Sequence, residues 1–240
     1  MPEGAFEHDG RMVPAHLLHG WSAAQVRAAE QPLLDAGVPL MARAARGLAA
    51  VVRELLADRG GSRLLVLAGS GSNGGDALLA AAELVEDGCT ATVVALGGRI
   101  HEVGLRAALA AGAERLDGAE PAAVAAAAAR SDAVLDGILG TGARGGLRSP
   151  AREAVRAMLP VLESATGPAV VAVDLPSGVD PDDGSVSPPV LPAATTVTFG
   201  AMKAGLLLPP GRDLAGAVRL IDIGLGPALA RQRPLLRASR

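Results

Sequence analysis

The 240 residues are half hydrophobic, which suits one large or two small domains with a buried core and excludes a disordered chain. The formal net charge is −3 and only three residues are aromatic, so the chain lacks the basic surface and the stacking side chains that nucleic-acid binding uses. One cysteine excludes an intrachain disulfide and a cysteine metal cluster. The sequence shows no secretory signal and no apolar run near the ~18 residues of a membrane span, so we expect a cytoplasmic protein without a membrane partner.

The N-terminal part is predicted to contain an extension and two helices. Residues 1–20 show no clear hydrophobic period and are expected to be flexible. Ser22 is predicted to cap a helix that ends at Gly37, because Gln25 stands three residues later in a capping-box pattern. A second helix is predicted over about 38–59, where Gly60 and Gly61 follow.

From residue 64 the hydrophobic period alternates between short apolar strands and helices. We predict strands over 64–68, 90–96, 132–136, 169–175, 195–199 and 217–223, and helices over 75–88, 101–112, 121–131 and 149–164. This alternation is typical of an α/β fold, and we predict a Rossmann-like three-layer α/β/α sandwich with a mostly parallel sheet that the last two strands extend. One domain is expected over 21–230, with a C-terminal tail over 231–240.

Three loops follow strands of this predicted sheet and are expected to meet at one edge. They read GSGSNGGD over 69–76, GILGTGARGG over 137–146 and DLPSGVD over 174–180. Ligands of open α/β sheets bind at the carboxyl ends of the strands. The spacing Gly69-x-Gly71-x-x-Gly74 lets backbone N–H groups approach a phosphate at a helix N-terminus, and the second loop is interpreted as another anion cradle. A flexible glycine loop is the alternative interpretation of either one.

The glycine spacing alone does not indicate a redox dinucleotide enzyme. The first loop follows two helices, and the second predicted strand ends in Leu96-Gly97-Gly98-Arg99, without the carboxylate that binds ribose hydroxyls. Arg99 could bind the 2′-phosphate of an NADP-type nucleotide, or it is an ordinary loop arginine without a ligand. The four histidines form no metal-binding spacing, and no Gly-x-Ser-x-Gly elbow indicates a hydrolase.

Two predicted strands end in aspartates, Asp136 and Asp174, within apolar surroundings. A buried carboxylate needs a cation, backbone donors or a ligand, although either residue also suits a helix cap or a turn. The topology brings Asn73 and Ser177 nearby. These oxygen ligands suit an alkali or alkaline-earth cation rather than zinc, and the low carboxylate count favours a monovalent one.

Four segments together resemble the NAD(P)H-hydrate epimerases, the family of the YjeF N-terminal domain. They are GSGSNGGDALLAAAEL, VLDGILGTGARGGLR, VDLPSGVD and VTFGAMKAGLLLPPGRDLAGAVRLIDIGLG. The resemblance covers roughly residues 21–227 in the family's order. The family's first loop usually reads Gly-x-Gly-Asn-Asn-Gly-Gly-Asp-Gly, and here Ser72 and Ala77 depart from it. In some members a lysine after the second strand lines the pocket, where this chain has Gly97-Gly98-Arg99.

The resemblance implies the ligands of the site and the partners of the protein. The residues implied to contact the hydrated nucleotide are Ser72, Asn73, Gly74, Gly75, Asp76, Gly140, Thr141, Gly142, Ala143, Arg144, Gly145, Gly146 and Asp174. Potassium is implied at Asn73, Asp136 and Ser177. Because the family is often fused to an ADP- or ATP-dependent dehydratase, that activity is expected on a separate protein. We also expect a homodimer.

The implied reaction is isomerisation, the interconversion of the R and S epimers of NADHX or NADPHX, which are hydrated at C6 of the nicotinamide ring. Loss of the C6 hydroxyl gives an iminium stabilised by the ring nitrogen, and water can return to either face. We expect Asp174 to act as acid and base, with burial raising its pKa. Ring opening is a competing route. The alternative function is a nucleotide-binding scaffold or sensor without turnover, which Ser72 and the missing pocket lysine leave open.

Overall fold

The centre of the protein is a seven-stranded parallel sheet. The computed structural model describes residues 5–8, 11–14 and 19–237. The strands are β3 (Arg63–Ala68), β4 (Thr90–Ala95), β5 (Glu114–Leu116), β6 (Ala133–Gly137), β7 (Ala169–Val173), β8 (Thr195–Phe199) and β9 (Ala217–Ile221). Their order is β5-β4-β3-β6-β7-β8-β9, and every neighbouring pair is parallel. The predicted parallel sheet, including its extension by the last two strands, is confirmed.

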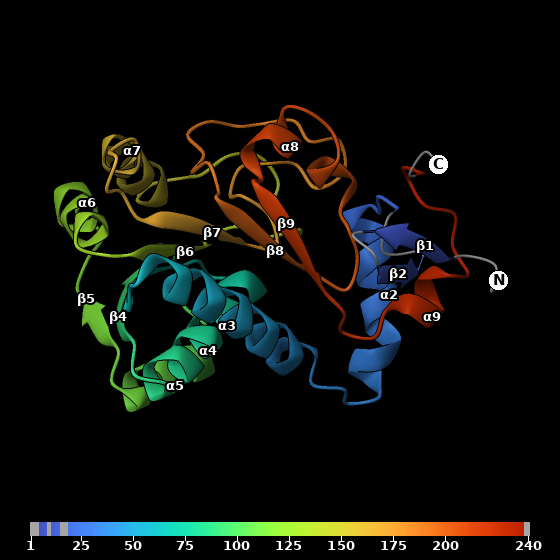
Figure 1. Cartoon of the computed structure of the whole chain (residues 1–240), viewed down its shortest axis with the longest axis horizontal. Helices are drawn as coiled ribbons and strands as arrows, with labels where there is room; N and C mark the ends of the chain where they lie inside the picture. The colour runs from blue at the N-terminus through green and yellow to red at the C-terminus, as the bar shows by residue number, and fades with distance from the viewer. Residues whose placement is uncertain (1–4, 9–10, 15–18, 238–240) are drawn as a thin grey trace.

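Helices cover both faces of this sheet (Figure 1). The long helices are α2 (Ala23–Asp35), α3 (Leu40–Arg59), α4 (Ser72–Glu86), α5 (Glu102–Ala111), α6 (Pro121–Ala129) and α7 (Ala151–Leu162). Helices α3, α4 and α5 share one apolar core with the sheet, and α6 and α7 share another on the opposite face. The predicted three-layer α/β/α sandwich is therefore confirmed. Three shorter helical segments follow β8: η1 (Ala204–Leu206), α8 (Gly211–Leu214) and α9 (Gly226–Leu229).

Local sequence signals set the ends of the first two long helices as predicted. Ser22 Oγ accepts from the Gln25 backbone N–H at 3.2 Å, and Gln25 Oε1 accepts from the Ser22 N–H at 3.0 Å, which completes a capping box. Gly37 follows α2 with φ 74°, and Gly60 ends α3 with φ 63°. Glycine adopts this left-handed conformation without the steric cost of a side chain.

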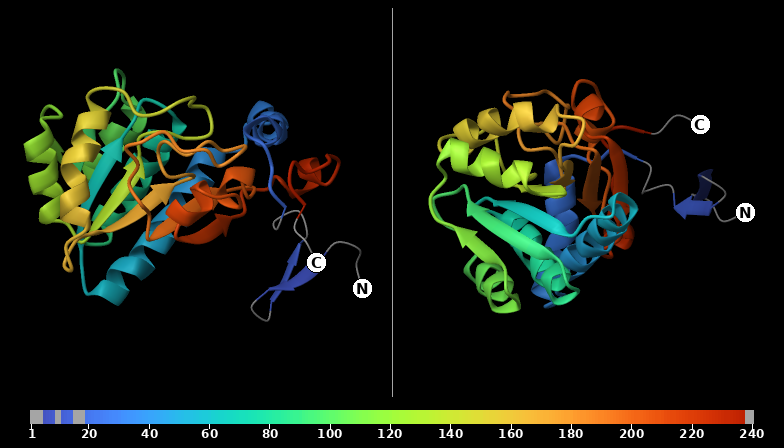
Figure 2. Two further views of the ribbon diagram at one scale, coloured as in Figure 1. Left: turned by 90° about the horizontal axis from the view of Figure 1, so that it is seen from above. Right: turned by 60° about the vertical axis from the view of Figure 1, so that its left-hand side comes forward.

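Helix α2 lies outside the three layers, beside the C-terminal segment (Figure 2). The Trp21 N–H donates to the Met202 carbonyl at 2.8 Å, and the Ala204 N–H donates to the Trp21 carbonyl at 3.0 Å. Gly20 and Leu236 pair in an antiparallel bridge. These backbone bonds hold α2 next to the loop that follows β8.

Two short features differ from the predicted elements. Strand β5 lies at the edge of the sheet between two predicted helices, and its three residues are too few to show a period. Within the predicted extension over 1–20, β1 (Ala5–His8) and β2 (Arg11–Pro14) form an antiparallel hairpin. The rest of that extension, except positions 19 and 20, lies outside the described residues, as do residues 238–240 of the predicted tail.

The order in which strands are added to the sheet changes direction at β3: β4 and β5 lie on one side of it, and β6 to β9 lie on the other. Strand β3 pairs with β4 on one side and with β6 on the other, so the connections diverge between β3 and β6. In this register Ala68 lies opposite Gly137, and the loops that follow both strands meet. Such a switch point is where open α/β sheets bind ligands. None of the helices in the described ranges has the length and apolar character needed to cross a membrane.

Candidate active site

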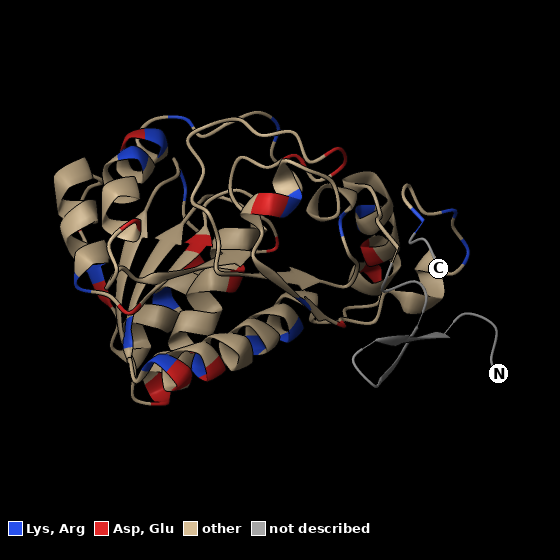
Figure 3. Ribbon diagram, turned by 45° about the horizontal axis from the view of Figure 1, so that its top comes forward, with Lys and Arg blue, Asp and Glu red and all other residues tan. Residues whose placement is uncertain are grey.

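Buried charge is concentrated at the carboxyl edge of the sheet. Most charged residues lie on the outer helices and loops (Figure 3), whereas the buried ones in the described part of the chain are Asp76, Asp136, Asp174 and Lys203. All four follow or end strands β3, β6, β7 and β8. Burying charged groups is costly unless they are paired or bonded, so this concentration indicates a functional site.

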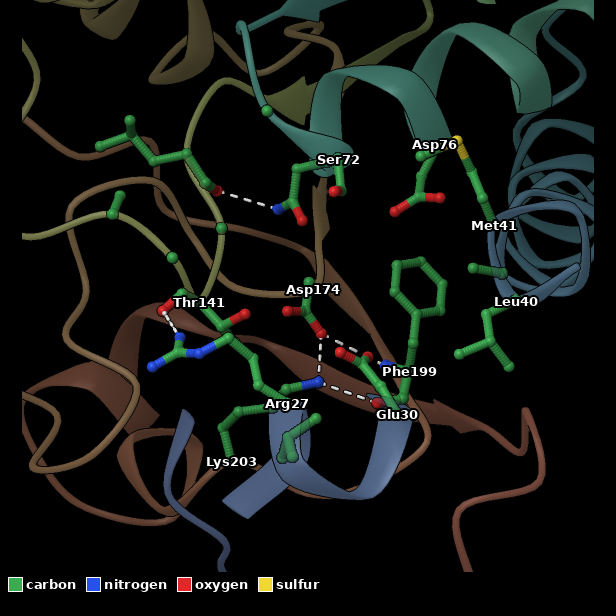
Figure 4. Close-up of a pocket in the computed structure, with 18 of the residues that line it drawn as sticks. Arg27, Glu30, Leu40, Met41, Ser72, Asp76, Thr141, Asp174, Phe199 and Lys203 are labelled. Atoms are coloured by element: carbon green, nitrogen blue, oxygen red, sulfur yellow. Dashed lines mark hydrogen bonds and ion pairs between the residues drawn. The ribbon is translucent and has the colours of Figure 1, made fainter. Parts of the chain in front are cut away.

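A cavity of about 540 Å³ opens at this edge (Figure 4). Of the residues predicted to bind substrate, those that line it are Ser72, Asn73, Asp76, Gly140, Thr141, Gly142, Ala143 and Asp174. Arg144, Gly145 and Gly146 instead line smaller neighbouring hollows. Helix α2 and the start of α3 complete the wall with Arg27, Glu30 and Met41. The predicted loops therefore converge, and helix α2, which was predicted as a helix but not as part of the site, closes the cavity.

The glycines of the first loop are needed for close backbone contact. A Cβ atom at Gly69 would lie 1.9 Å from the Ile138 carbonyl oxygen, and one at Gly74 would lie 2.2 Å from the Gly69 carbonyl oxygen. Real Cβ contacts are never this short, so these positions exclude larger residues. Gly71 caps α4 without a side-chain bond, which leaves the first N–H groups of this helix open to an anion.

The predicted oxygen ligands are linked through the backbone of Leu139, with Asn73 in the cavity wall and Asp136 and Ser177 behind it. The Asp136 side chain is fully buried, and it accepts from Ser177 Oγ at 2.6 Å and from the Ser177 N–H at 2.9 Å. Burial raises the pKa of Asp136, and the bonds from Ser177 oppose that shift. Asn73 Nδ2 donates to the carbonyls of Leu139, at 2.9 Å, and Val173.

This cluster fits a monovalent cation by the chemistry of its donors. A carboxylate, a hydroxyl and two backbone carbonyls are hard oxygen ligands, which alkali ions prefer. The described part of the chain contains no group of three or more His, Cys, Asp or Glu side chains placed to hold a metal ion, so the donors are not those of a zinc site. Asn73 directs its amide nitrogen at the two carbonyls. To act as a ligand, its amide would have to present the oxygen instead.

Asp174 lies at the centre of the site in a buried ion pair. Its φ is 68°, and it is the only described residue other than glycine with positive φ, a strained conformation typical of functional sites. Lys203 Nζ pairs with Asp174 Oδ1 and also donates to Thr198 Oγ1 at 3.1 Å and to the Phe199 carbonyl at 2.9 Å. The exposed fractions of Asp174 and Lys203 are 5% and 1%. The pair fixes the Asp174 carboxyl in the wall of the cavity, with the Lys203 ammonium on its buried side.

Lys203 was not among the predicted site residues. The expected position for a pocket lysine was after the second predicted strand, where Gly97 and Gly98 instead line a neighbouring hollow. The lysine comes from the loop after β8. A signal existed, because Lys203 is the only lysine among the 22 basic residues. A chain that otherwise uses arginine keeps a lysine where a compact point charge fits a buried carboxylate.

Two further acids face the cavity, Asp76 from the first turn of α4 and Glu30 from α2. Burial, followed by the negative charges of Asp174 and Glu30, raises the pKa of Asp76 to about 8, and the positive charge of Lys203 opposes the shift. Burial also raises the pKa of Glu30. Arg27 Nη1 donates to the Thr141 carbonyl at 3.1 Å and thereby ties α2 to the second loop.

Comparison with known proteins places this architecture in a family. The sequence model described as "YjeF-related protein N-terminus" matches residues 37–205. The NAD(P)H-hydrate epimerase of Clavibacter michiganensis subsp. michiganensis is 52% identical over 95% of this chain and 99% of its own. That of Microbacterium testaceum is 47% identical over 91% and 84%. The bifunctional NAD(P)H-hydrate repair enzyme Nnr of Mycobacterium tuberculosis is 41% identical over 86% of this chain and 42% of its own.

A solved structure shows the same fold. The crystal structure of yeast ynu0 superposes with a TM-score of 0.64 over 77% of this chain and 81% of its own, at 22% sequence identity. The family match covers more than half of the chain, and it includes both glycine loops and the Asp174–Lys203 pair. The chain therefore belongs to the family of YjeF-related protein N-terminal domains.

Proposed function

We propose that this protein is an isomerase that interconverts the R and S epimers of NADHX and NADPHX. One observation carries the proposal: a buried carboxylate–ammonium pair and a second buried acid line a cavity between two glycine loops. Its relatives named NAD(P)H-hydrate epimerase align over nearly the whole of this chain, which supports the same activity here.

The cavity is arranged for a hydrated nicotinamide ring attached to a diphosphate. Its volume of about 540 Å³ lies within the range of small-molecule sites. The glycine loops and the open N-terminus of α4 suit the phosphates. A neighbouring hollow of about 420 Å³ shares Ser70, Leu139 and Ala143 with the cavity and offers room for the second nucleoside.

Asp174 is proposed to act directly on the C6 centre. When the C6 hydroxyl leaves, the ring nitrogen stabilises an iminium cation, and a nearby carboxylate lowers the energy of that charge. The same carboxylate can accept a proton from the water that adds back. Lys203 is proposed to position Asp174, since the ammonium is bonded to Asp174, Thr198 and Phe199 at once.

A potassium ion is proposed at Asn73, Asp136 and Ser177. When bound, it would supply fixed positive charge that holds the loops after β3, β6 and β7 together. We expect potassium to raise the melting temperature of the wild type more than sodium does, through binding to the folded state. Asp136→Ala should abolish that difference, and an equal response of wild type and variant to both salts would contradict the potassium site.

The function is tested by adding the purified protein to pure R-NADHX without ATP. We expect NMR to show equilibration of the C6 epimers far above the uncatalysed rate. A scaffold or sensor predicts that the nucleotide binds while the R epimer persists, which would overturn the proposal. Transfer of a hydride to or from added NAD(P) would instead favour a redox enzyme.

A separate ADP- or ATP-dependent dehydratase is proposed to act on the epimerised nucleotide. This chain spans only 42% of the bifunctional Nnr relatives, which leaves room in those proteins for a second activity. The expected homodimer stays a prediction. Sedimentation of the purified protein tests it.

A further inference from the structure

Asp76 is a buried acid of the cavity with an unsatisfied oxygen. Its side chain extends from the first turn of α4 into the cavity, toward Phe199 (Figure 4). The residue is 6% exposed, and its Oδ1 atom has no hydrogen-bond partner within the described residues. A carboxylate in this position would be costly, whereas the neutral carboxylic acid is far easier to bury.

The groups around Asp76 leave no cation to neutralise it. The charged and titratable groups that face it are Arg27 and Glu30 of α2, Asp174 after β7, Lys203 after β8 and, on the side of Gly75, the α5 N-cap His101. Helix α3 contributes apolar side chains. Lys203 bonds to Asp174, and Arg27 bonds to the Thr141 carbonyl. His101 Nδ1 accepts from the Gly104 N–H at 3.0 Å.

The two aspartates of the cavity are therefore in opposite environments. Asp174 has an ammonium, a hydroxyl and a backbone N–H on its Oδ1, so this carboxyl is paired with a cation and hydrogen-bonded. Burial and the two acidic neighbours Asp174 and Glu30 raise the pKa of Asp76 to about 8, so Asp76 carries its proton at neutral pH. Pairs of acids with opposed environments commonly divide the roles of acid and base.

We propose that Asp76 is the proton donor of the epimerisation and that Asp174 is the acceptor; this inference rests on the proposed function. Asp76 transfers its proton to the C6 hydroxyl, the C6–O bond breaks with its electron pair on oxygen, and water leaves. The ring nitrogen lone pair forms the C6=N bond of an iminium. Water adds to C6, either face being open to it, and gives a proton to Asp174. That proton returns to Asp76 through solvent, so no oxidant or reductant is consumed.

The test compares Asp76→Asn with Asp87→Asn, the same change at the exposed C-cap of the same helix. Loss of a general acid costs typically about 10²–10⁴-fold in rate, so we expect Asp76→Asn to lose kcat by that factor and Asp87→Asn to keep it. The wild-type kcat should fall as the pH rises through about 8, because the donor ionises, and Asp76→Asn should lose this limb. Turnover of Asp76→Asn within about tenfold of wild type would overturn the proposal.

A second measurement does not depend on turnover. Carbon-13 NMR of the wild-type carboxyl groups should show the Asp76 signal titrating near pH 8, identified as the signal that is missing in Asp76→Asn. Titration of Asp76 near its ordinary pKa would overturn the proposal even if the variant were inactive or unfolded. If wild type fails to epimerise R-NADHX but Asp76 titrates near 8, the proposed function fails while the assignment of the protonated acid stands.

Discussion

At the scale of single residues, the Asp174–Lys203 pair has the largest effect on the site. Both side chains are buried, and a buried ion pair adds little net stability because desolvation offsets its attraction. Removing one partner alone is different, since it leaves the other charge buried without compensation. The pair is therefore better explained by fixing the charge and position of Asp174 than by stabilising the fold.

We predict that Lys203→Met lowers the free energy of unfolding by about 3–5 kcal/mol, because it leaves the Asp174 carboxylate buried and unpaired. The double variant Asp174→Asn/Lys203→Met should lose clearly less than the sum of the two single variants, since neither charge remains. Urea denaturation of the four proteins measures this coupling. Arg212→Met, which breaks an exposed pair with Asp213, is the matched control and should change stability by less than about 1 kcal/mol. Strictly additive losses would contradict the role of the pair.

The sequence predicted some residues of the site and missed others for a physical reason. Asp136 lies in β6, and Asn73 and Ser177 stand within five residues of the ends of β3 and β7, in the glycine loop and the Asp-x-Pro-Ser-Gly turn that the sequence singles out, so the parallel sheet brings them to one edge. Lys203 stands four residues beyond β8, and its side chain returns to the site because the loop bonds to Trp21. The contact between Trp21 and residues 202–204 joins segments far apart in the chain, so no local sequence pattern indicates it.

At the scale of secondary-structure elements, the turn from β3 into α4 shapes the site. A Cβ atom at Gly69 has no space against Ile138 in the loop after β6, and one at Gly74 has no space against the Gly69 carbonyl within the turn itself. At Gly71, by contrast, nothing lies within 4 Å of a Cβ position, and its φ of −94° is open to any residue. The spacing of the three glycines was visible in the sequence, but its reason, loop-to-loop packing as well as phosphate access, required the structure.

We predict that Gly74→Ala lowers the free energy of unfolding by about 1–3 kcal/mol, the usual cost of overpacking. The added Cβ would lie 2.2 Å from a backbone carbonyl oxygen that the sheet holds in place. Gly71→Ala in the same loop adds a Cβ that meets nothing, so it should cost no more than about 1 kcal/mol, the usual loss when alanine replaces a better N-cap residue. Equal effects of the two substitutions in urea denaturation would show that packing does not explain these glycines.

The sequence predicted the helices and strands that have clear capping residues or apolar runs, and it missed the short strands that have neither. The capping box at Ser22 and the left-handed glycines set the ends of α2 and α3, and runs of apolar residues set the long strands. Strand β5 has three residues with no buried side chain, so only its pairing with β4 defines it. The hairpin of β1 and β2 likewise depends on pairing between two four-residue strands.

At the scale of the whole molecule, the site depends on segments outside the family match. The match covers residues 37–205, yet α2 supplies Arg27 and Glu30 to the cavity wall. Trp21 is 1% exposed, and its backbone bonds to Met202 and Ala204 enclose Lys203 between them. The N-terminal segment is therefore expected to be part of the same cooperative unit as the sheet, as the predicted domain over 21–230 requires.

Trp21 is the only tryptophan, so its fluorescence reports on this segment alone, while far-UV circular dichroism reports on all helices and the sheet. We predict that the two signals follow one transition in urea, because coincident transitions of different probes indicate two-state unfolding of a single domain. Trp21→Phe is the control for the dichroism curve. A variant that begins at residue 37 should have a lower unfolding midpoint and lose nucleotide binding, since it lacks α2 and the bonds that flank Lys203. A fluorescence transition that clearly precedes the dichroism transition would show instead that α2 detaches from an intact sheet, and that the site can open by releasing this helix.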